Sequence, residues 1–248
     1  MTIDFSTLPR IAGHRGAKGT APENTLPSFR RAAEIGVRFI EFDANLAGEG
    51  EIVSFHDYTL ERCTDGTGNL SDHSLSDLAL LDAGEKFSPE FRGTHIPTLR
   101  EVIEVLSALK MGANLEIKSR KGLERETVIG VARDLKEHWP SDLPLLLSSF
   151  SEVVMSLLLE YLPDVSRGWL VEAVPNDWQE KLRAFEAASF HCEDEPLTAA
   201  HVKAATDAGY PVLVYTVNER DRAHELLKWG VSSVISDFPE RMMDLDRN

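Results

Sequence analysis

The sequence predicts a barrel of parallel β-strands enclosed by α-helices. Eight short apolar runs recur along the 248 residues, and the segments between most of them carry apolar residues at three- and four-residue intervals, as amphipathic helices require. Strands that alternate with helices form parallel sheets through right-handed crossovers, and eight such units close into a (β/α)8 or TIM barrel. A doubly wound open sheet is the alternative fold.

The expected elements follow one another along the whole chain. Strands are expected at residues 10–14, 39–43, 114–117, 144–148, 168–171, 189–192, 212–215 and 233–236. Helices are expected at residues 25–36, 99–110, 123–139, 151–161, 178–188, 198–208 and 219–229. Asn24 or Thr25 is the expected N-cap of the first helix, because both side chains accept hydrogen bonds from free backbone N–H groups. Gly209 and Gly230 each follow a helical run, where left-handed backbone ends a helix.

One stretch breaks the alternation, and we interpret it as an insertion between the second strand and its helix. Residues 57–95 contain several Asp, Gly and Ser residues and exceed the length of an ordinary barrel connection. Because loops that follow barrel strands lie at the catalytic face, we expect the insertion to lie over the site as a lid or specificity loop. A surface excursion is the alternative. No Pro-, Gly- or Ser-rich linker divides residues 1–248, so one domain is expected.

Charge and composition exclude several classes of protein. Lys and Arg number 26 against 41 Asp and Glu, and the net charge of -15 repels nucleic acids and anionic membrane surfaces. We therefore expect no nucleic-acid partner and no stable membrane association. No apolar run is long enough for a membrane span or a signal-peptide core, so a cytoplasmic protein is expected. Cys63 and Cys192 lack nearby metal-ligand partners and are expected to be reduced packing residues. The sequence leaves the oligomeric state open.

Charged residues stand at alternate positions in two of the expected strands. Residues two apart in a strand point to the same face, so Glu41 and Asp43 project together, as do Glu116 and Lys118. If the apolar residues between them pack under the helices, three carboxylates and one lysine lie inside the barrel mouth. Buried carboxylates need compensation, and a hard divalent cation with oxygen ligands provides it. An ion-pair network between Lys118 and one of the acids is the alternative.

Two histidines are expected near the same end of the barrel. His14 ends the first strand, and His56 follows a short apolar run. A pair of imidazoles supplies a general acid and a general base near neutral pH. Arg15 offers a fork of donors that suits phosphate oxygens, and Gly16 permits close backbone approach. A lone histidine is more often structural, but two histidines near the same barrel mouth as a carboxylate group favour a catalytic role.

Six short motifs occur in order in the first half of the chain. They are Gly13-His14-Arg15-Gly16, Ala21-Pro22-Glu23-Asn24-Thr25, Ile40-Glu41-Phe42-Asp43, His56-Asp57 with Leu60-Glu61-Arg62, Ile96-Pro97-Thr98-Leu99, and Leu115-Glu116-Ile117-Lys118. Their order and spacing resemble the glycerophosphodiester phosphodiesterase family, in particular its short cytoplasmic bacterial members. Cys63 stands where many members of this family carry a threonine, and the run His191-Cys192-Glu193-Asp194 is more acidic than the family pattern.

The resemblance implies a TIM barrel that hydrolyses a glycerophosphodiester to glycerol 3-phosphate and an alcohol. It implies a divalent metal, Ca²⁺ or Mg²⁺, as cofactor. The residues that match the family's metal ligands are Glu41, Asp43 and Glu116, those that match its acid and base are His14 and His56, and those that match its phosphate-binding residues are Arg15 and Lys118. The alternatives are another phosphodiesterase on this barrel, similar to sphingomyelinase D or to a phosphatidylinositol-specific lyase, and a non-catalytic phosphoglycerol-binding module.

Overall fold

The computed structural model describes residues 3–246, and it confirms the predicted barrel. Within that range eight parallel strands are hydrogen-bonded side by side, and β1 pairs with both β9 and β2, which closes the ring. The strands are β1 (Ile11–His14), β2 (Phe39–Leu46), β3 (Ile52–Val53), β4 (Gly112–Ile117), β5 (Leu145–Ser149), β6 (Ser166–Val171), β7 (Ser189–Glu193), β8 (Val212–Tyr215) and β9 (Ser233–Ser236). All eight predicted strands belong to the ring, whereas β3 does not.

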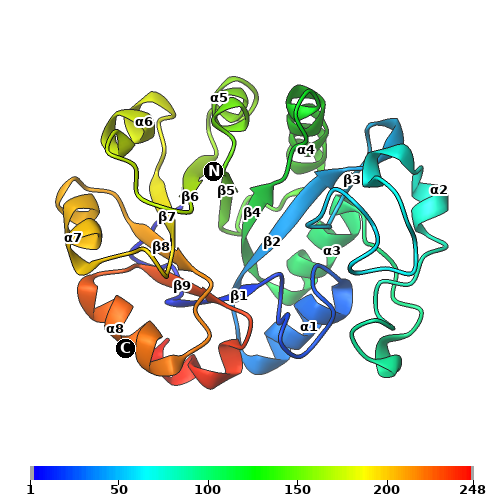
Figure 1. Ribbon diagram of the computed structural model, residues 1–248, viewed down its shortest axis with the longest axis horizontal. Coiled ribbons are helices and arrows are strands. Elements are labelled where there is room, and N and C mark those ends of the chain that lie inside the picture. The colour runs from blue at the N-terminus through cyan, green and yellow to red at the C-terminus, as the bar shows by residue number, and fades with distance from the viewer. Residues whose placement is uncertain (1–2, 247–248) are drawn as a thin grey trace.

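The helices surround the strands (Figure 1). They are α1 (Leu26–Ile35), α2 (Leu75–Leu78), α3 (Leu99–Leu109), α4 (Glu124–His138), α5 (Glu152–Tyr161), α6 (Trp178–Ala184), α7 (Ala199–Asp207) and α8 (Arg220–Trp229). Their apolar faces pack on the outward side chains of the strands, and Ile40 and Phe42 of β2 are fully buried in this layer. The charged residues at positions 41 and 43 therefore turn to the inside of the barrel. The register pairs Asp43 with Glu116 across β2 and β4.

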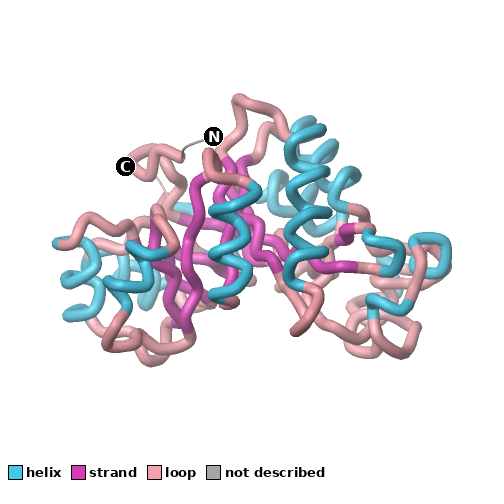
Figure 2. Tube along the Cα trace, turned by 90° about the horizontal axis from the view of Figure 1, so that it is seen from above, coloured by secondary structure: helices cyan, strands magenta, loops and turns pink. Residues whose placement is uncertain are grey.

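The insertion projects to one side of the barrel, as Figures 1 and 2 both show. The two-residue strand β3 pairs antiparallel with the end of β2, outside the closed ring, and the chain then runs through short helical turns to α3. These turns enclose a small apolar core of their own, which includes Phe55, Leu60 and Leu78. The insertion thus packs beside β2 around a hydrophobic core that is separate from that of the barrel.

The residues predicted to begin and end helices lie at helix ends, and the structure decides between the two candidate N-caps of α1. Thr25 is the N-cap of α1 and accepts a hydrogen bond from Ser28 N, while Asn24 binds elsewhere. Gly230 ends α8 with φ +103°, and Gly209, just beyond α7, has φ +86°, so both occupy left-handed backbone as predicted. None of the helices within residues 3–246 is long and apolar enough to cross a membrane.

Candidate active site

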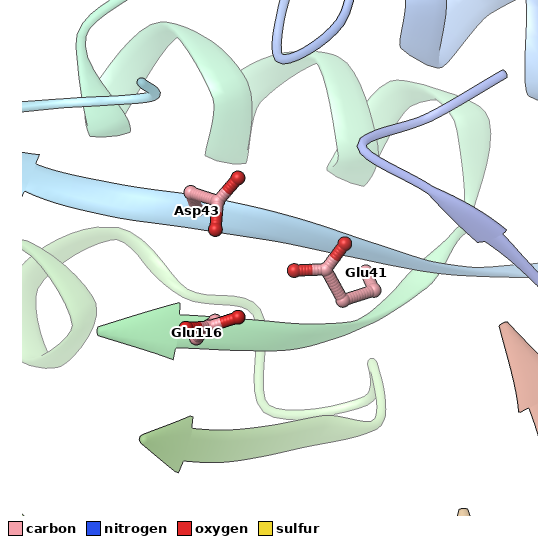
Figure 3. A group of neighbouring side chains, drawn as sticks. All are labelled: Glu41, Asp43 and Glu116. Atoms are coloured by element: carbon pink, nitrogen blue, oxygen red, sulfur yellow. The ribbon is translucent and has the colours of Figure 1, made fainter. Parts of the chain in front are cut away.

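The carboxyl ends of neighbouring strands bring the predicted acidic residues together. Glu41 and Asp43 extend from β2 and Glu116 from β4; Figure 3 shows Asp43 over β2, Glu116 over β4 and Glu41 between the two strands. One carboxylate oxygen from each residue lies within 4.8 Å of the other two. The alternation of charged and apolar residues in two parallel strands is sufficient to build this group, because adjacent parallel strands point their corresponding side chains the same way.

The chemistry of this group fits a hard divalent cation. Asp43 is fully buried, Glu41 is 4% exposed and Glu116 is 8% exposed. Burial and the neighbouring carboxylates raise the pKa of Glu41 well above its usual value, and burial raises the pKa of Glu116 to about 7. Glu41 Oε1 is buried and has no hydrogen-bond partner. Three buried carboxylates with a free oxygen are the ligand type that Ca²⁺ and Mg²⁺ prefer.

Two cations of the chain also reach the carboxylates. Lys118 Nζ contacts Glu116 Oε1 and lies 3.4 Å from Asp43 Oδ1, while Arg15 Nε lies 3.3 Å from Asp43 Oδ2. Burial alone would raise the pKa of Asp43, but Lys118 and Arg15 outweigh it and hold that pKa well below its usual value. The ion-pair network considered as an alternative is therefore present. Lys118 contacts Asp43 and Glu116 but not Glu41. The ion pairs therefore do not neutralise all three carboxylates, and the same group can also bind a metal ion.

A tight turn after β1 places Arg15 at the site. Arg15 adopts φ +48° and Gly16 φ +89°, and the backbone N–H of Arg15 donates to Glu41 Oε2 at 3.1 Å. Ser28 Oγ donates to the carbonyl of Arg15 at 2.9 Å. A Cβ on Gly16 would lie 2.4 Å from Ser28 Oγ, so only glycine fits at this position. The missing side chain of Gly16 thus allows the backbone to pack closely against Ser28 of α1.

His14 is oriented by a residue from the other end of the chain. His14 Nδ1 lies 2.6 Å from Asp237 Oδ1, and Asn218 Nδ2 donates to the second oxygen of Asp237 at 3.1 Å. Because an ionised carboxylate only accepts, Nδ1 of His14 carries the proton. Burial lowers the pKa of His14. Burial alone would raise the pKa of Asp237, but the hydrogen bond and charge of His14, together with Lys18 and Asn218, lower it to about 2.

Asp237 was not singled out from the sequence. It lies in the closing segment after β9, 223 positions from His14, and only the closure of the barrel makes the two residues neighbours. The signal in the sequence was its place directly after a predicted strand, because residues at that position lie at the catalytic face.

His56 has a carboxylate partner of its own. His56 Nδ1 lies 2.6 Å from Oδ1 of the adjacent Asp57, and Asp57 in turn accepts from Arg62. Burial lowers the pKa of His56 from its usual 6.5. Each histidine therefore has Nδ1 bound to an aspartate, which fixes the tautomer that leaves Nε2 available.

A cavity of about 410 Å³ joins these residues to the far wall of the barrel. Its lining residues are His14, Arg15, His56, Glu116, Lys118, Phe150, Glu193, Asp194, Glu195, Tyr215 and Thr216. None of these lining residues comes from residues 57–95, all of which lie in the described range, and a role of the insertion in substrate selection stays a prediction. The insertion forms its core beside β2, and Asp57, Tyr58 and Arg62 connect it to the surroundings of the site; Tyr58 Oη donates to the carbonyl of Ser119, next to Lys118, at 2.9 Å.

The fold and the cavity at the carboxyl ends of its strands place the chain among the TIM-barrel enzymes. Comparison with known proteins narrows this class. The family model of the glycerophosphoryl diester phosphodiesterase family matches residues 14–241. The chain therefore belongs to the glycerophosphoryl diester phosphodiesterase family.

Individual relatives cover nearly all of the chain. A glycerophosphodiester phosphodiesterase of Caldanaerobacter subterraneus subsp. tengcongensis is 32% identical over 242 residues, which make up 96% of this chain and 97% of that protein. A phosphodiesterase of Oleispira antarctica, solved in complex with the product sn-glycerol-3-phosphate, is 41% identical with a TM-score of 0.95 and 97% coverage of both chains. A glycerophosphodiester phosphodiesterase of Thermotoga maritima is 25% identical with a TM-score of 0.76, covering 96% of this chain and 98% of that one.

Proposed function

We propose that this enzyme hydrolyses glycerophosphodiesters to glycerol 3-phosphate and an alcohol with the help of Ca²⁺ or Mg²⁺ and two histidines. The observation that carries the proposal is the meeting of a buried carboxylate group, two aspartate-bound histidines and two cations in or beside one cavity. The family supplies the substrate class. The product found in the Oleispira antarctica relative is the one expected here.

Glu41, Asp43 and Glu116 would hold the metal ion. When bound, a divalent ion at such carboxylates draws electron density from phosphoryl oxygens and offsets charge that develops on them. With one divalent ion, the three carboxylates, Lys118 and Arg15 carry about one net positive charge. A phosphodiester monoanion neutralises that charge, which explains how a protein with a net charge of -15 can bind an anion.

Arg15 and Lys118 would bind the phosphate. Both line the cavity, and both are held by carboxylates that keep them in place before substrate arrives. The guanidinium of Arg15 presents several N–H donors in a plane, which suits two phosphate oxygens at once, whereas Lys118 offers a point charge. When substrate binds, a phosphate oxygen would replace a carboxylate oxygen as the partner of Arg15 or Lys118, so neither side chain would lose its ion pair.

His14 and His56 would share the proton transfers. One imidazole removes the proton from the attacking hydroxyl, and the other donates a proton to the leaving alkoxide. The attacking group is the 2-hydroxyl of the glycerol, which gives a cyclic phosphate first, or it is water. A substrate analogue without the 2-hydroxyl separates these routes, because equal turnover of the analogue excludes the cyclic one.

The assay is release of glycerol 3-phosphate from glycerophosphocholine, glycerophosphoethanolamine and glycerophosphoglycerol. His14→Ala and His56→Ala should each lower turnover about 10²- to 10⁴-fold, as loss of a general acid or base does. His138→Ala, on the outer helix α4, is the matched control and should leave turnover unchanged. Near-full activity of either site variant, or release of a product other than glycerol 3-phosphate, would refute the proposal.

We also propose that the protein works in a reducing compartment such as the cytoplasm. Cys63 and Cys192 are both free, and Cys192 is buried in the barrel wall. Unpaired cysteines are typical of proteins that are not exposed to oxidising surroundings. Cell fractionation followed by detection of the protein tests the location.

A further inference from the structure

Arg62, in the insertion, joins two loops of the barrel although it does not line the active-site cavity. Its guanidinium bonds two carboxylates at once. Towards Asp57, Nε donates to Oδ2 at 2.5 Å and Nη2 donates to Oδ1 at 3.0 Å. Towards Glu23, Nη1 donates to Oε2 at 2.9 Å and Nη2 donates to Oε1 at 2.8 Å. Arg62 thus makes a bidentate pair of hydrogen bonds to each of the two carboxylates.

The same two carboxylates touch the proposed reaction machinery. Asp57 Oδ1 lies 2.6 Å from His56 Nδ1, and Glu23 Oε1 accepts from Arg15 Nη1 at 2.6 Å. Arg62 therefore contacts His56 indirectly, through Asp57, and Arg15 indirectly, through Glu23. Glu23 comes from the loop after β1 and Asp57 from the segment after β3, so the contact also ties the insertion to the first barrel loop.

We propose that Arg62 is a positioning residue for phosphodiester hydrolysis, which holds His56 and Arg15 in their working orientation through Asp57 and Glu23. The inference rests on the roles proposed above for His56 and Arg15. A planar fork of N–H donors is needed for this task, because only a guanidinium can make two parallel hydrogen bonds to each of two carboxylates. The positive charge of Arg62 also offsets part of the negative charge of Glu23 and Asp57.

Loss of Arg62 should affect the two partners differently. Without it, Glu23 would keep its full charge for Arg15 and compete with the phosphate, which raises KM. Asp57 would lose both hydrogen bonds from Arg62, so its carboxylate could rotate. Because His56 is hydrogen-bonded to Asp57, its imidazole would turn as well, and kcat would fall. A misplacement of about 1 Å in such a group can cost on the order of 100-fold in rate.

The surroundings of Arg62 make a chemical rescue possible. A second cavity, of about 280 Å³, is lined by Arg62 together with Glu23, Lys18, Lys86, Cys63 and Phe87. The Arg62 side chain is 46% exposed. Truncation at Arg62 therefore opens a space that a small cation can enter from solvent and in which it meets both carboxylates.

The experiment compares steady-state kinetics of Arg62→Ala and Arg62→Lys with those of the wild-type enzyme, with glycerophosphocholine as substrate. Arg62→Ala should lose about 10- to 100-fold in kcat/KM, through both parameters. Millimolar methylguanidinium should restore part of the rate, and urea, which has a similar shape without charge, should not. Arg92→Ala is the matched control, since Arg92 lies in the same insertion and pairs with Glu85 at the surface.

Wild-type kinetics of Arg62→Ala would overturn the proposal. So would a loss that methylguanidinium does not restore and that Arg62→Lys does not share, because such a loss reports folding alone. If Arg62→Ala does not fold, Arg62→Lys decides: slow turnover with a wild-type circular dichroism spectrum supports the role, and wild-type turnover refutes it. His56→Ala, measured alongside, separates the two hypotheses, because an active His56→Ala refutes the proposed function itself.

Discussion

The contact between Asp237 and His14 gives a sharp prediction for a single substitution. Asn218 Nδ2 donates to Asp237 Oδ2, so in Asp237→Asn the new amide oxygen would face Asn218 and the new NH2 group would face His14. An NH2 group donates to an imidazole nitrogen, whereas the carboxylate accepts from it. The substitution should therefore move the proton of His14 from Nδ1 to Nε2, the nitrogen that the wild-type tautomer leaves unprotonated and available. Side-chain volume hardly changes.

The size of the effect follows from the hydrogen bond that is lost. Hydrogen bonds to charged groups contribute about 1.5–3 kcal/mol, and 1.36 kcal/mol corresponds to a factor of ten. The preference for the working tautomer should then fall by about 10- to 150-fold, and kcat should fall with it. KM should change little, because His14 Nδ1 and Asp237 lie behind the imidazole.

Steady-state kinetics of Asp237→Asn, with melting temperature as a check on folding, tests this reasoning. Asp221→Asn on the exposed side of α8 is the control and should match the wild-type enzyme. A kcat of Asp237→Asn within twofold of wild type would show that Asp237 does not set the tautomer of His14. A change in KM alone would show that it acts on substrate binding.

Three further predictions concern other groups. Glu41→Gln and Glu116→Gln should each abolish most activity yet raise the melting temperature of the metal-free protein, because burial raises the pKa of both carboxyls and their charged forms oppose folding at neutral pH; calorimetry that shows lower melting temperatures would contradict this. A plot of kcat/KM against pH should be bell-shaped with its acidic limb below pH 6.5, because burial lowers the pKa of both His14 and His56 and whichever of them is the base must be deprotonated to act. An acidic limb above pH 7 would assign the base to another group. Reductant should leave melting temperature and activity unchanged, because Cys63 and Cys192 are free; a reductant-sensitive melt would argue for a disulfide.

The barrel could be predicted from local patterns because its elements depend on them. Each strand is a short apolar run and each helix repeats its apolar residues with helical period, so the eight strands were found within a few residues of their observed bounds. The carboxylate group followed from the same logic, since Glu41 and Asp43 share a strand face. The division of the chain into one domain, the choice of metal and the roles of the histidines remain predictions.

The contacts that orient the site could not be predicted, because they join distant positions. Asp237 meets His14 only when β9 pairs with β1, and Arg62 meets Glu23 only when the insertion folds beside the first barrel loop. Asn24 shows the same limit at short range. It was a candidate helix cap, but its Nδ2 donates to Asp43 Oδ2 at 2.7 Å, and only the packing of α1 on β2 decides between these partners.

The proposed activity depends on a divalent ion, and removal of that ion is the decisive experiment. The enzyme is treated with excess chelator and dialysed, and release of glycerol 3-phosphate from glycerophosphocholine is measured before and after addition of Ca²⁺ or Mg²⁺. We expect turnover to fall to background without a divalent ion and to return with one of the two, because Glu41, Asp43 and Glu116 form a buried group of carboxylates that fits a hard cation. Full turnover of the chelated enzyme would contradict the account.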